Sequence, residues 1–385
     1  MRKQWRGVAA TAVAAGLLAG YQGSFTARAA VITHSKRAAV STNALAFASA
    51  GQVAVLEGGA LTTAGVGQSP LWSPDGSQLL FSTMDYIGNA ESIFLADTHG
   101  ANAKLLMSNA YPWINAAWSR DGKYVLYTVP TTKLAIAAPN APVKATQITL
   151  KVEALKVGSK SATTLGTFSF TAGCSSKVTA LQNAFALAEG SYIGTPSTLI
   201  WAQPNLVAVQ STCGGQGITL VHLHGGKNVT LPTWAGGVLS PDGSTIAATV
   251  AGSKPGSSAQ VGLITVATGR TSVLAPKLNA GSVAWSPDSK NLYVAVMPTN
   301  PKSGLAQIYT MSKSGKSAKS VYSTHAAGIF HLSPLKVSPN VAFTMVASSA
   351  ANAVVPPATL VENLTLGSKV PAQALLQGGQ GTWRP

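Results

Sequence analysis

The chain has 385 residues, of which 46% are hydrophobic and only 10% are charged, and it contains 38 glycines and 21 prolines. This length allows either two or three ordinary domains or one large all-β domain with a sizeable core and many tight turns. Basic residues (27) outnumber acidic ones (11), but they are scattered and not interleaved with aromatic residues, so we expect no nucleic-acid partner.

The first thirty residues have the pattern of an export signal. Three basic residues in the first six positions precede a thirteen-residue apolar run, Val8–Gly20, and small residues at Ala27 and Ala29 favour cleavage before Ala30. The run is short for a membrane span, which needs about 20 residues. We therefore predict an exported protein, extracellular, cell-wall-associated or periplasmic, with no transmembrane span after cleavage. An uncleaved N-terminal anchor is the alternative.

A short motif then recurs along the chain. Four copies place an aromatic residue or Leu before Ser-Pro-Asp-Gly or a close variant: Trp72–Gly76, Trp118–Gly122, Leu239–Gly243 and Trp285–Ser289. This order suits a type I turn, with Ser first, Pro fixing φ at the second position and Gly fourth. The residues that we assign to structural repeat turns are Trp72, Asp75, Gly76, Trp118, Asp121, Gly122, Asp242, Gly243, Trp285, Asp288 and Trp383.

The spacing of the motif indicates a ring of similar units. Trp72 and Trp118 are 46 residues apart, as are Leu239 and Trp285, which is close to the period of propeller blades. Each copy is followed by apolar runs that predict further strands, so that each unit has four antiparallel strands. Such a unit cannot bury its own apolar faces, and radial stacking solves this problem.

The repeat resembles that of the TolB-like β-propeller family, in which a WD-like motif of aromatic-Ser-Pro-Asp-Gly is followed by a strand and then by Ile-Tyr-x-Met. The last element is present as Ile308-Tyr309-Thr310-Met311, and the resemblance extends from about Gln52 to Pro385. It implies an all-β fold, a single propeller of four-stranded antiparallel blades. The motif is specific for the fold and says little about the ligand.

The blade count follows from the repeat positions. Counting Trp72, Trp118, Trp201, Leu239, Trp285, Val337 and Trp383 gives seven blades, and six is the alternative. Strands near Gln52 lack an inner partner and Trp383 lies in an inner strand that lacks the rest, so we expect strands from both termini to close the ring. The predicted domains are a signal peptide (1–29), a flexible leader (30–42) and a propeller (43–385) with an insertion near 171–196.

The remaining candidates for chemistry are few. The two cysteines, Cys174 and Cys213, predict one disulfide in an oxidising compartment. His222 and His224 alternate along a strand but lack a third metal ligand. The acidic residues outside the repeat turns contain no close pair, and the chain has no G-x-S-x-G motif. We predict no catalytic residue, no metal site and no cofactor.

Recognition is therefore expected at the rim of the central channel, on the stretches that precede each motif aromatic residue. Trp113 and Trp234 are additional to the motif tryptophans, and aromatic rings beside amides suit a peptide or sugar. Packing between blades is the alternative role for these rings. The residues that we assign to the ligand-binding rim are Gln68, Tyr111, Trp113, Asn115, Trp234, Asn279, His331 and Gln380.

We accordingly expect a monomeric, non-enzymatic binding or scaffold protein. Its expected partner is a protein, a peptide or an anionic envelope polymer. The positive charge would attract such a polymer, or it is a simple solubility charge. The alternative function is a propeller-type hydrolase, lyase or lactonase with its site at the channel mouth.

Overall fold

The fold is known from a computed structural model. It describes residues 44–49, 51–84, 90–111, 114–131, 146–172, 198–210, 217–223, 225–251, 258–275, 278–298, 305–325, 328–335, 340–346, 359–365, 373–377 and 379–384. The regular elements in these ranges are all strands. Within the same ranges there is no helix long and apolar enough to cross a membrane. The predicted signal peptide, the leader, Cys174 and Cys213 lie outside the described residues.

The strands pair into seven four-stranded antiparallel sheets. From inner to outer strand, the first three sheets are β4 (Gln68–Trp72), β5 (Gln78–Met84), β6 (Glu91–Asp97) and β7 (Lys104–Ala110); β8 (Ala117–Trp118), β9 (Tyr124–Pro130), β10 (Thr146–Lys156) and β11 (Ala162–Ala172); and β12 (Thr198–Gln203), β13 (Leu206–Gln210), β14 (Ile218–His222) and β15 (Val229–Leu231).

The next three sheets are β16 (Trp234–Leu239), β17 (Thr245–Val250), β18 (Gln260–Thr265) and β19 (Thr271–Val273); β20 (Ala280–Trp285), β21 (Asn291–Val296), β22 (Ala306–Ser312) and β23 (Lys319–Thr324); and β24 (Gly328–Pro334), β25 (Asn340–Val346), β26 (Thr359–Thr365) and β27 (Gln373–Gln377). The last sheet is β28 (Gly379–Trp383), β1 (Leu45–Ser49), β2 (Gln52–Glu57) and β3 (Ala60–Val66).

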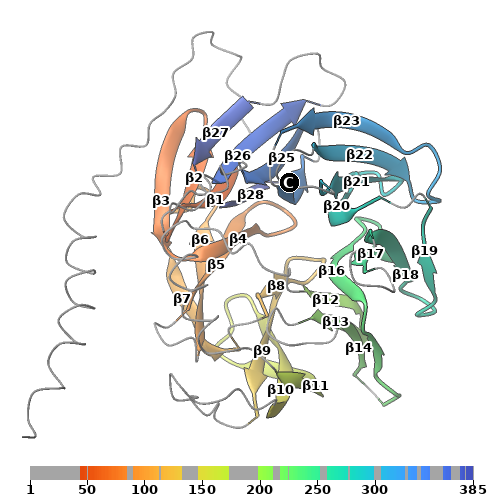
Figure 1. The fold of residues 1–385 in the computed structure, drawn as a ribbon. Helices are drawn as coiled ribbons and strands as arrows, with labels where there is room; N and C mark the ends of the chain where they lie inside the picture. Colours follow the sequence, from red (N-terminus) through yellow and green to blue (C-terminus); the bar gives the residue numbers. More distant parts are fainter. Residues whose placement is uncertain are drawn as a thin grey trace, which may run out of the picture. The chain divides into compact units, whose positions relative to one another are not determined.

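The sheets are arranged around a common centre, with their first strands innermost (Figure 1). Neighbouring inner strands are in contact from β8 through β12, β16, β20, β24 and β28 to β4. The prediction of a single all-β propeller with four-stranded antiparallel blades is confirmed. It succeeded because the repeat turn marks the end of an inner strand, which is the feature that defines each unit.

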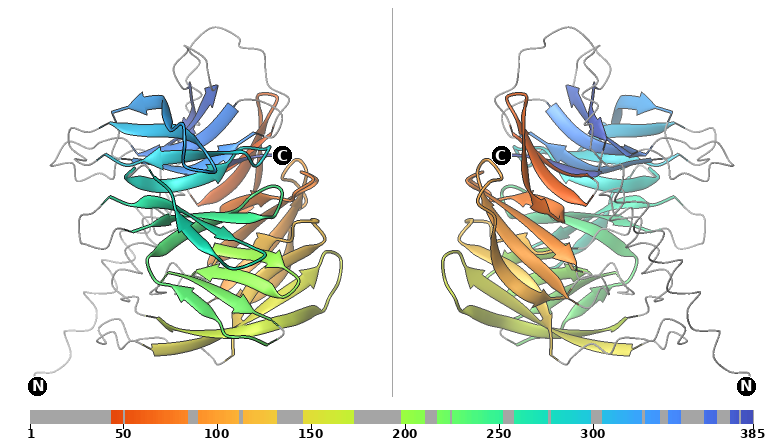
Figure 2. Two further views of the ribbon diagram at one scale, coloured as in Figure 1. Left: turned by 90° about the vertical axis from the view of Figure 1, so that its right-hand side faces the viewer. Right: turned by 90° about the vertical axis from the view of Figure 1, so that its left-hand side faces the viewer.

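Strands from both termini share one sheet, as the sequence predicts. The innermost strand β28 pairs with β1, with Leu45 opposite Trp383 and Ala48 opposite Gly379. The first strands and the last strands lie side by side in Figures 1 and 2. One detail differs from the expectation, because β1 precedes the strands that the sequence analysis recognised. The N-terminal region therefore contributes three strands to this sheet, and the C-terminal region contributes the fourth.

Strand β1 was missed because its sequence is rich in alanine and not in β-branched residues. The small side chains have a packing reason. Ala44, Ala46 and Ala48 are fully buried in one cluster with Trp72, which ends β4 in the adjacent sheet. Larger residues at these positions would separate the two sheets.

Polar contacts of Arg384 reinforce this closure. Its backbone N–H donates to the Ala44 carbonyl (2.9 Å), and its guanidinium donates to the Glu57 carboxylate (2.5 Å) and to Thr98 Oγ1 (3.1 Å). The guanidinium carbon lies 5.9 Å from the centroid of the Trp72 ring. Residues at both ends of the chain and in the β6–β7 turn are thereby joined.

The repeat turns are held by their serine and aspartate side chains. In the first copy, Ser73 Oγ donates to Asp75 Oδ1 (2.6 Å) and accepts from the Gln78 N–H (3.0 Å). The same serine–aspartate bond, 2.6 to 2.7 Å long, recurs in the other three copies. Gly76 at the fourth position has φ of 71°, which an L side chain rarely adopts. The aspartates of the motif therefore accept hydrogen bonds within their turns.

The motif tryptophans do more than pack between sheets. Three of them donate the indole N–H to a carbonyl near the end of the preceding inner strand, in each case over 3.1 Å: Trp72 to Thr382, Trp118 to Leu71 and Trp285 to Val238. Each acceptor is the next-to-last residue of its strand. One side chain thus supplies both apolar burial and a directional bond between neighbouring units. Trp201 differs, because its buried indole N–H has no hydrogen-bond partner among the described residues.

We expect the Trp285→Phe variant to lose about 0.5–1.5 kcal/mol of unfolding free energy, because it keeps a ring but leaves the Val238 carbonyl without its donor. The matched Trp201→Phe variant removes an N–H that bonds nothing described, so it should lose distinctly less. Urea denaturation of both variants measures the difference. Equal losses would show that the indole bond contributes nothing.

A buried glutamate lies at the interface between the first two sheets. Glu91 in β6 is 0% exposed and shares its strand face with Ile93, which packs against Tyr127 of the neighbouring sheet. Burial raises the pKa of Glu91 to about 8, and the Ser82 hydroxyl offsets this only to a small extent. The carboxyl is therefore protonated in the folded chain at neutral pH.

Two opposite effects should set the pH dependence of stability. Hydrogen bonds from the turn serines lower the pKa of the motif aspartates, to about 2 at Asp242, so their stabilisation is lost as the pH falls from about 4 towards 2. Glu91 acts in the other direction, because the unfolded chain releases its proton above pH 4.5 while the folded chain retains it up to about 8.

We therefore expect the free energy of unfolding to be highest near pH 4–5 and to fall up to about pH 8. The Glu91→Gln variant should remove the fall above pH 4.5 and be more stable than the wild type at pH 8. Urea unfolding at a series of pH values tests this, with Glu153→Gln as a control at a less buried position. Parallel curves for the wild type and Glu91→Gln would contradict the role of Glu91.

Candidate functional site

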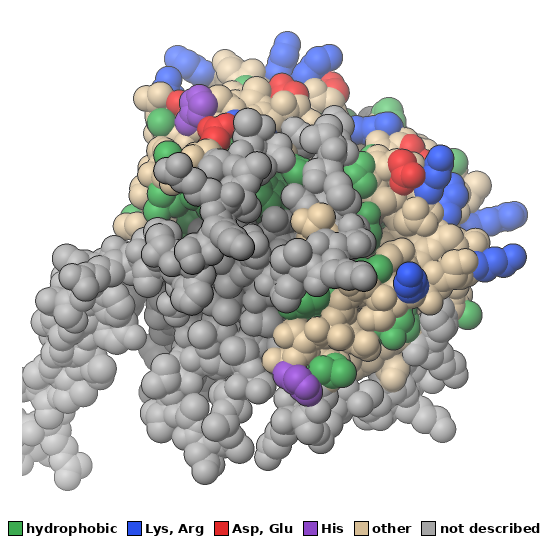
Figure 3. Space-filling model, turned by 90° about the horizontal axis from the view of Figure 1, so that it is seen from above, with side chains coloured by type: hydrophobic (Ala, Val, Ile, Leu, Met, Phe, Trp, Pro, Cys, Tyr) green, Lys and Arg blue, Asp and Glu red, His purple; other side chains and the backbone are tan. Residues whose placement is uncertain are grey.

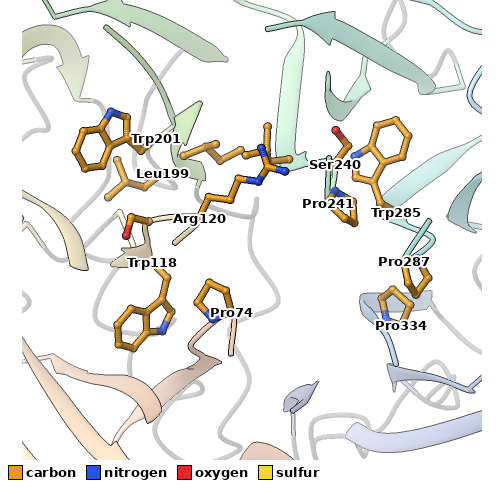
Figure 4. A pocket seen from close by; sticks show the side chains of 13 residues that line it. Pro74, Trp118, Arg120, Leu199, Trp201, Ser240, Pro241, Trp285, Pro287 and Pro334 are labelled. Atoms are coloured by element: carbon orange, nitrogen blue, oxygen red, sulfur yellow. The ribbon is translucent and has the colours of Figure 1, made fainter. Parts of the chain in front are cut away.

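A cavity of about 560 Å³ opens where the inner strands end, and residues of six of the seven sheets line it. Its wall is mainly aromatic and pyrrolidine rings (Figure 4). The lining residues are Pro74, Trp118, Ser119, Arg120, Leu199, Ile200, Trp201, Leu239, Ser240, Pro241, Trp285, Pro287 and Pro334. The repeat turns thus build this mouth of the ring, and we refer to it as the turn-side mouth.

Among the described residues that line the cavity, Arg120 is the cationic one. It occupies the second position of the Ser119–Gly122 turn, where the corresponding residues of three other turns are Pro74, Pro241 and Pro287. The side chain extends toward Ser240 and Pro241 (Figure 4). At this position the copy that contains Arg120 differs from the other three clear copies of the motif.

The guanidinium lies close to a turn two sheets further around the ring. A β-carbon built on Gly243 would lie 2.4 Å from Arg120 Nη1, so any side chain there would displace the guanidinium. Gly243 also has φ of 73°, which favours glycine independently. The position of Arg120 therefore depends on the absence of a side chain at Gly243.

Arg120 is exposed and makes no ion pair with any residue that the structure describes. The two nearest turn aspartates are engaged elsewhere. Asp121 accepts from Ser119 Oγ (2.7 Å) and pairs with Lys123 (3.5 Å), and Asp242 accepts from Ser240 Oγ (2.6 Å). Arg120 is therefore a cation among apolar rings in the lining, next to turn aspartates that remain ionised but are not paired with it.

Four of the residues that the sequence analysis assigned to the rim lie at the other end of the inner strands: Gln68, Asn115, Trp234 and Asn279. Gln68 and Trp234 begin β4 and β16, and Asn115 and Asn279 precede β8 and β20. An inner strand of five or six residues spans about 17–20 Å, so these residues and the turn-side mouth are at opposite ends of the ring. None of the predicted rim residues whose side chains the structure describes lines the cavity.

Two of the proposed aromatic contacts are buried and cannot offer an exposed ring. Tyr111 is 1% exposed and Trp234 is 7% exposed, and each belongs to an apolar core cluster. For these two residues the prediction of exposed rings is wrong, and the alternative of packing between blades applies. Composition alone could not separate the two roles, because both need a large ring beside an inner strand.

The polar residues that were assigned to the rim differ in burial and in hydrogen bonding. The Asn279 amide donates to the Met297 carbonyl (3.1 Å) and accepts from the Ala259 N–H (3.4 Å), so both of its polar atoms serve the backbone. Gln68 and Asn115 are half-buried. His331 and Gln380 lie in β24 and β28, but their side chains are not among those described, and neither is any atom of Trp113. A binding role for Gln68, Asn115, Trp113, His331 and Gln380 stays a prediction.

Sequence reasoning missed the turn-side mouth because it assigned Trp118, Trp201 and Trp285 to structure alone. The signal that could have revealed it was Arg120, a charged residue where the other clear copies have proline. Lys and Arg side chains elsewhere are spread along the outer edge of the face in Figure 3 and do not form one patch there. They provide no comparable focus.

No family profile and no curated protein sequence matches this chain. Among solved structures, TolB from Acinetobacter baumannii is 17% identical with a TM-score of 0.44, and the alignment covers 89% of this chain and 66% of that one. A putative TolB from Agrobacterium tumefaciens is 12% identical with a TM-score of 0.46, covering 88% of this chain and 91% of that one.

The propeller domain of the Trilobed protease from Pyrococcus furiosus is 12% identical with a TM-score of 0.51, covering 84% of this chain and 89% of that one. That domain has an open velcro topology, whereas here β28 pairs with β1. TolB structures are thus among those similar to this chain, as the resemblance of the repeat predicts. At these identities the likeness shows the β-propeller fold alone.

Replacing Arg120 by the proline that the other three clear copies have at this position should leave the fold intact. We expect Arg120→Pro to be as stable as the wild type or about 0.4–1 kcal/mol more stable, because the turn geometry already accepts proline in three copies. Gly122→Ala in the same turn, at φ of 69°, should instead lose about 1–2 kcal/mol. Thermal unfolding of both variants measures this. Unfolding of Arg120→Pro at a markedly lower temperature would mean that Arg120 is a structural residue.

Proposed function

We propose that this chain is an exported, non-enzymatic binding propeller that holds a polypeptide partner over the turn-side mouth. The observation that carries the proposal is the cavity of about 560 Å³ with its wall of tryptophan and proline rings. Indole and pyrrolidine rings offer broad, rigid apolar contact at little entropic cost, as binding surfaces require. The mouth differs from the rim that the sequence suggested, but the type of function is the same.

The scaffold suits this role because the mouth is rigid. The lining residues stand on the ends of paired strands, and the turns between those strands are fixed by serine–aspartate bonds. Sites built on such elements keep their geometry better than sites on free loops. Within this proposal, we count the seven four-stranded sheets as seven blades of one ring.

The proposed export rests on the N-terminal sequence, where basic residues precede the apolar run Val8–Gly20 and a small-residue cleavage pattern follows. A protein outside the cytoplasm meets secreted, envelope or wall-associated partners. We favour a polypeptide over a bulk anionic polymer, because the mouth is lined mainly by apolar rings and has a volume of about 560 Å³.

Site-specific photocrosslinking tests the proposal. A benzoylphenylalanine placed at Pro287, which lines the mouth, should yield a discrete adduct with a protein partner in the native cell envelope. The turn accepts a residue other than proline at this position, as Arg120 shows in its own copy. The same residue placed at Val229, 44% exposed on the outer strand β15, is the control and should give no such adduct.

Identical adducts at both positions, or none at Pro287, would contradict recognition at the turn-side mouth. Recovery of cut fragments of the partner in place of the intact partner would instead support the hydrolytic alternative. Mass spectrometry of the purified adducts distinguishes these outcomes.

A further inference from the structure

Arg120 determines which ligand chemistry the turn-side mouth can select, and this inference rests on the function proposed above. Every other described wall group is apolar or a neutral hydroxyl, so the guanidinium is the charged group that a ligand meets there. An arginine fork recognises a carboxylate through two parallel N–H···O bonds.

Two observations argue that Arg120 is available to a ligand. It is exposed and has no ion-pair partner among the described residues, although Asp121 is its immediate neighbour in the same turn. Asp121 and Asp242 already accept serine hydroxyl bonds within their turns. Both carboxylates keep their negative charge, because these hydrogen bonds lower their pKa, but neither forms an ion pair with Arg120.

The side chain is also positioned in advance. Its Nη1 lies against Gly243, where the missing side chain provides the space, so Arg120 reaches from the β8–β9 turn toward the β16–β17 turn. A long cation that is already seated loses less conformational entropy when a ligand binds. Nothing in the fold requires an arginine here, because proline serves the same turn position in three other copies.

We propose that the turn-side mouth binds an acidic peptide segment: a carboxylate that pairs with Arg120, flanked by apolar residues that pack on the half-buried rings of Trp118 and Trp201. The carboxylate belongs either to an Asp or Glu side chain or to a chain terminus. The cavity of about 560 Å³ has the size of a site for a few residues and not for a folded domain.

Pools of N-acetylated heptapeptides test this. All positions except the central one are random uncharged residues, and the central residue is Asp in one amidated pool and Asn in a second. A third pool has central Asn and a free terminal carboxylate. The pools are passed over immobilised full-length protein at about 150 mM salt, where distant surface charges are largely screened, and retained peptides are quantified by mass spectrometry.

We expect the wild type to retain the Asp pool, the carboxylate-terminated pool or both at least about tenfold more than the amidated Asn pool. The pool that is retained identifies the source of the carboxylate. Arg120→Pro should abolish the preference while remaining folded. Lys123→Gln, which removes the same charge from the same turn but outside the cavity, should keep it.

Equal retention of all pools by the wild type, retention of none, or a preference that survives in Arg120→Pro would overturn the inference. These results are distinguishable from failure of the proposed function. If the Pro287 adduct forms but the pools are retained equally, the mouth binds a partner without recognising a carboxylate. If no adduct forms at Pro287, the function itself is wrong.

Discussion

The structure depends on how one four-stranded sheet attaches to the next. A tryptophan at the end of an inner strand covers the preceding sheet and donates its indole N–H to that sheet's innermost strand, as Trp72, Trp118 and Trp285 do. Apolar burial supplies most of the free energy, and the directional bond fixes how far the two sheets slide past each other. In these three contacts the bonded carbonyl belongs to the residue before the neighbour's own motif residue: Thr382 before Trp383, Leu71 before Trp72 and Val238 before Leu239.

The candidate site is a by-product of this arrangement. Placing each motif residue at a strand end brings the turns together, and their rings form a shared wall. Binding surface therefore arises without any added loop, and one substitution is enough to make it selective. Arg120 changes a single turn from apolar to cationic while its neighbours Ser119 and Asp121 keep the backbone unchanged. Structural and recognition roles are in this way assigned to different residues of the same short motif.

The fold could be predicted because the repeat is local: Ser, Pro, Asp and Gly act within one turn, and their spacing repeats. The site could not, since it depends on contacts between distant units. Whether Trp234 faces a channel or the core is decided by neighbours such as Gly262, whose missing side chain leaves room for the indole. Strand β1 escaped notice for a related reason, because alanines suit the close approach of Trp72 and carry no strand signal of their own.

The pairing of β28 with β1 has a consequence for biogenesis. Because Leu45 finds its partner Trp383 only when β28 is available, a chain that emerges from its N-terminus cannot complete the circle until β28 has been synthesised. Until then β1 presents an unpaired edge, which invites pairing with strands of other molecules. Folding that is delayed until β28 has emerged avoids this mispairing.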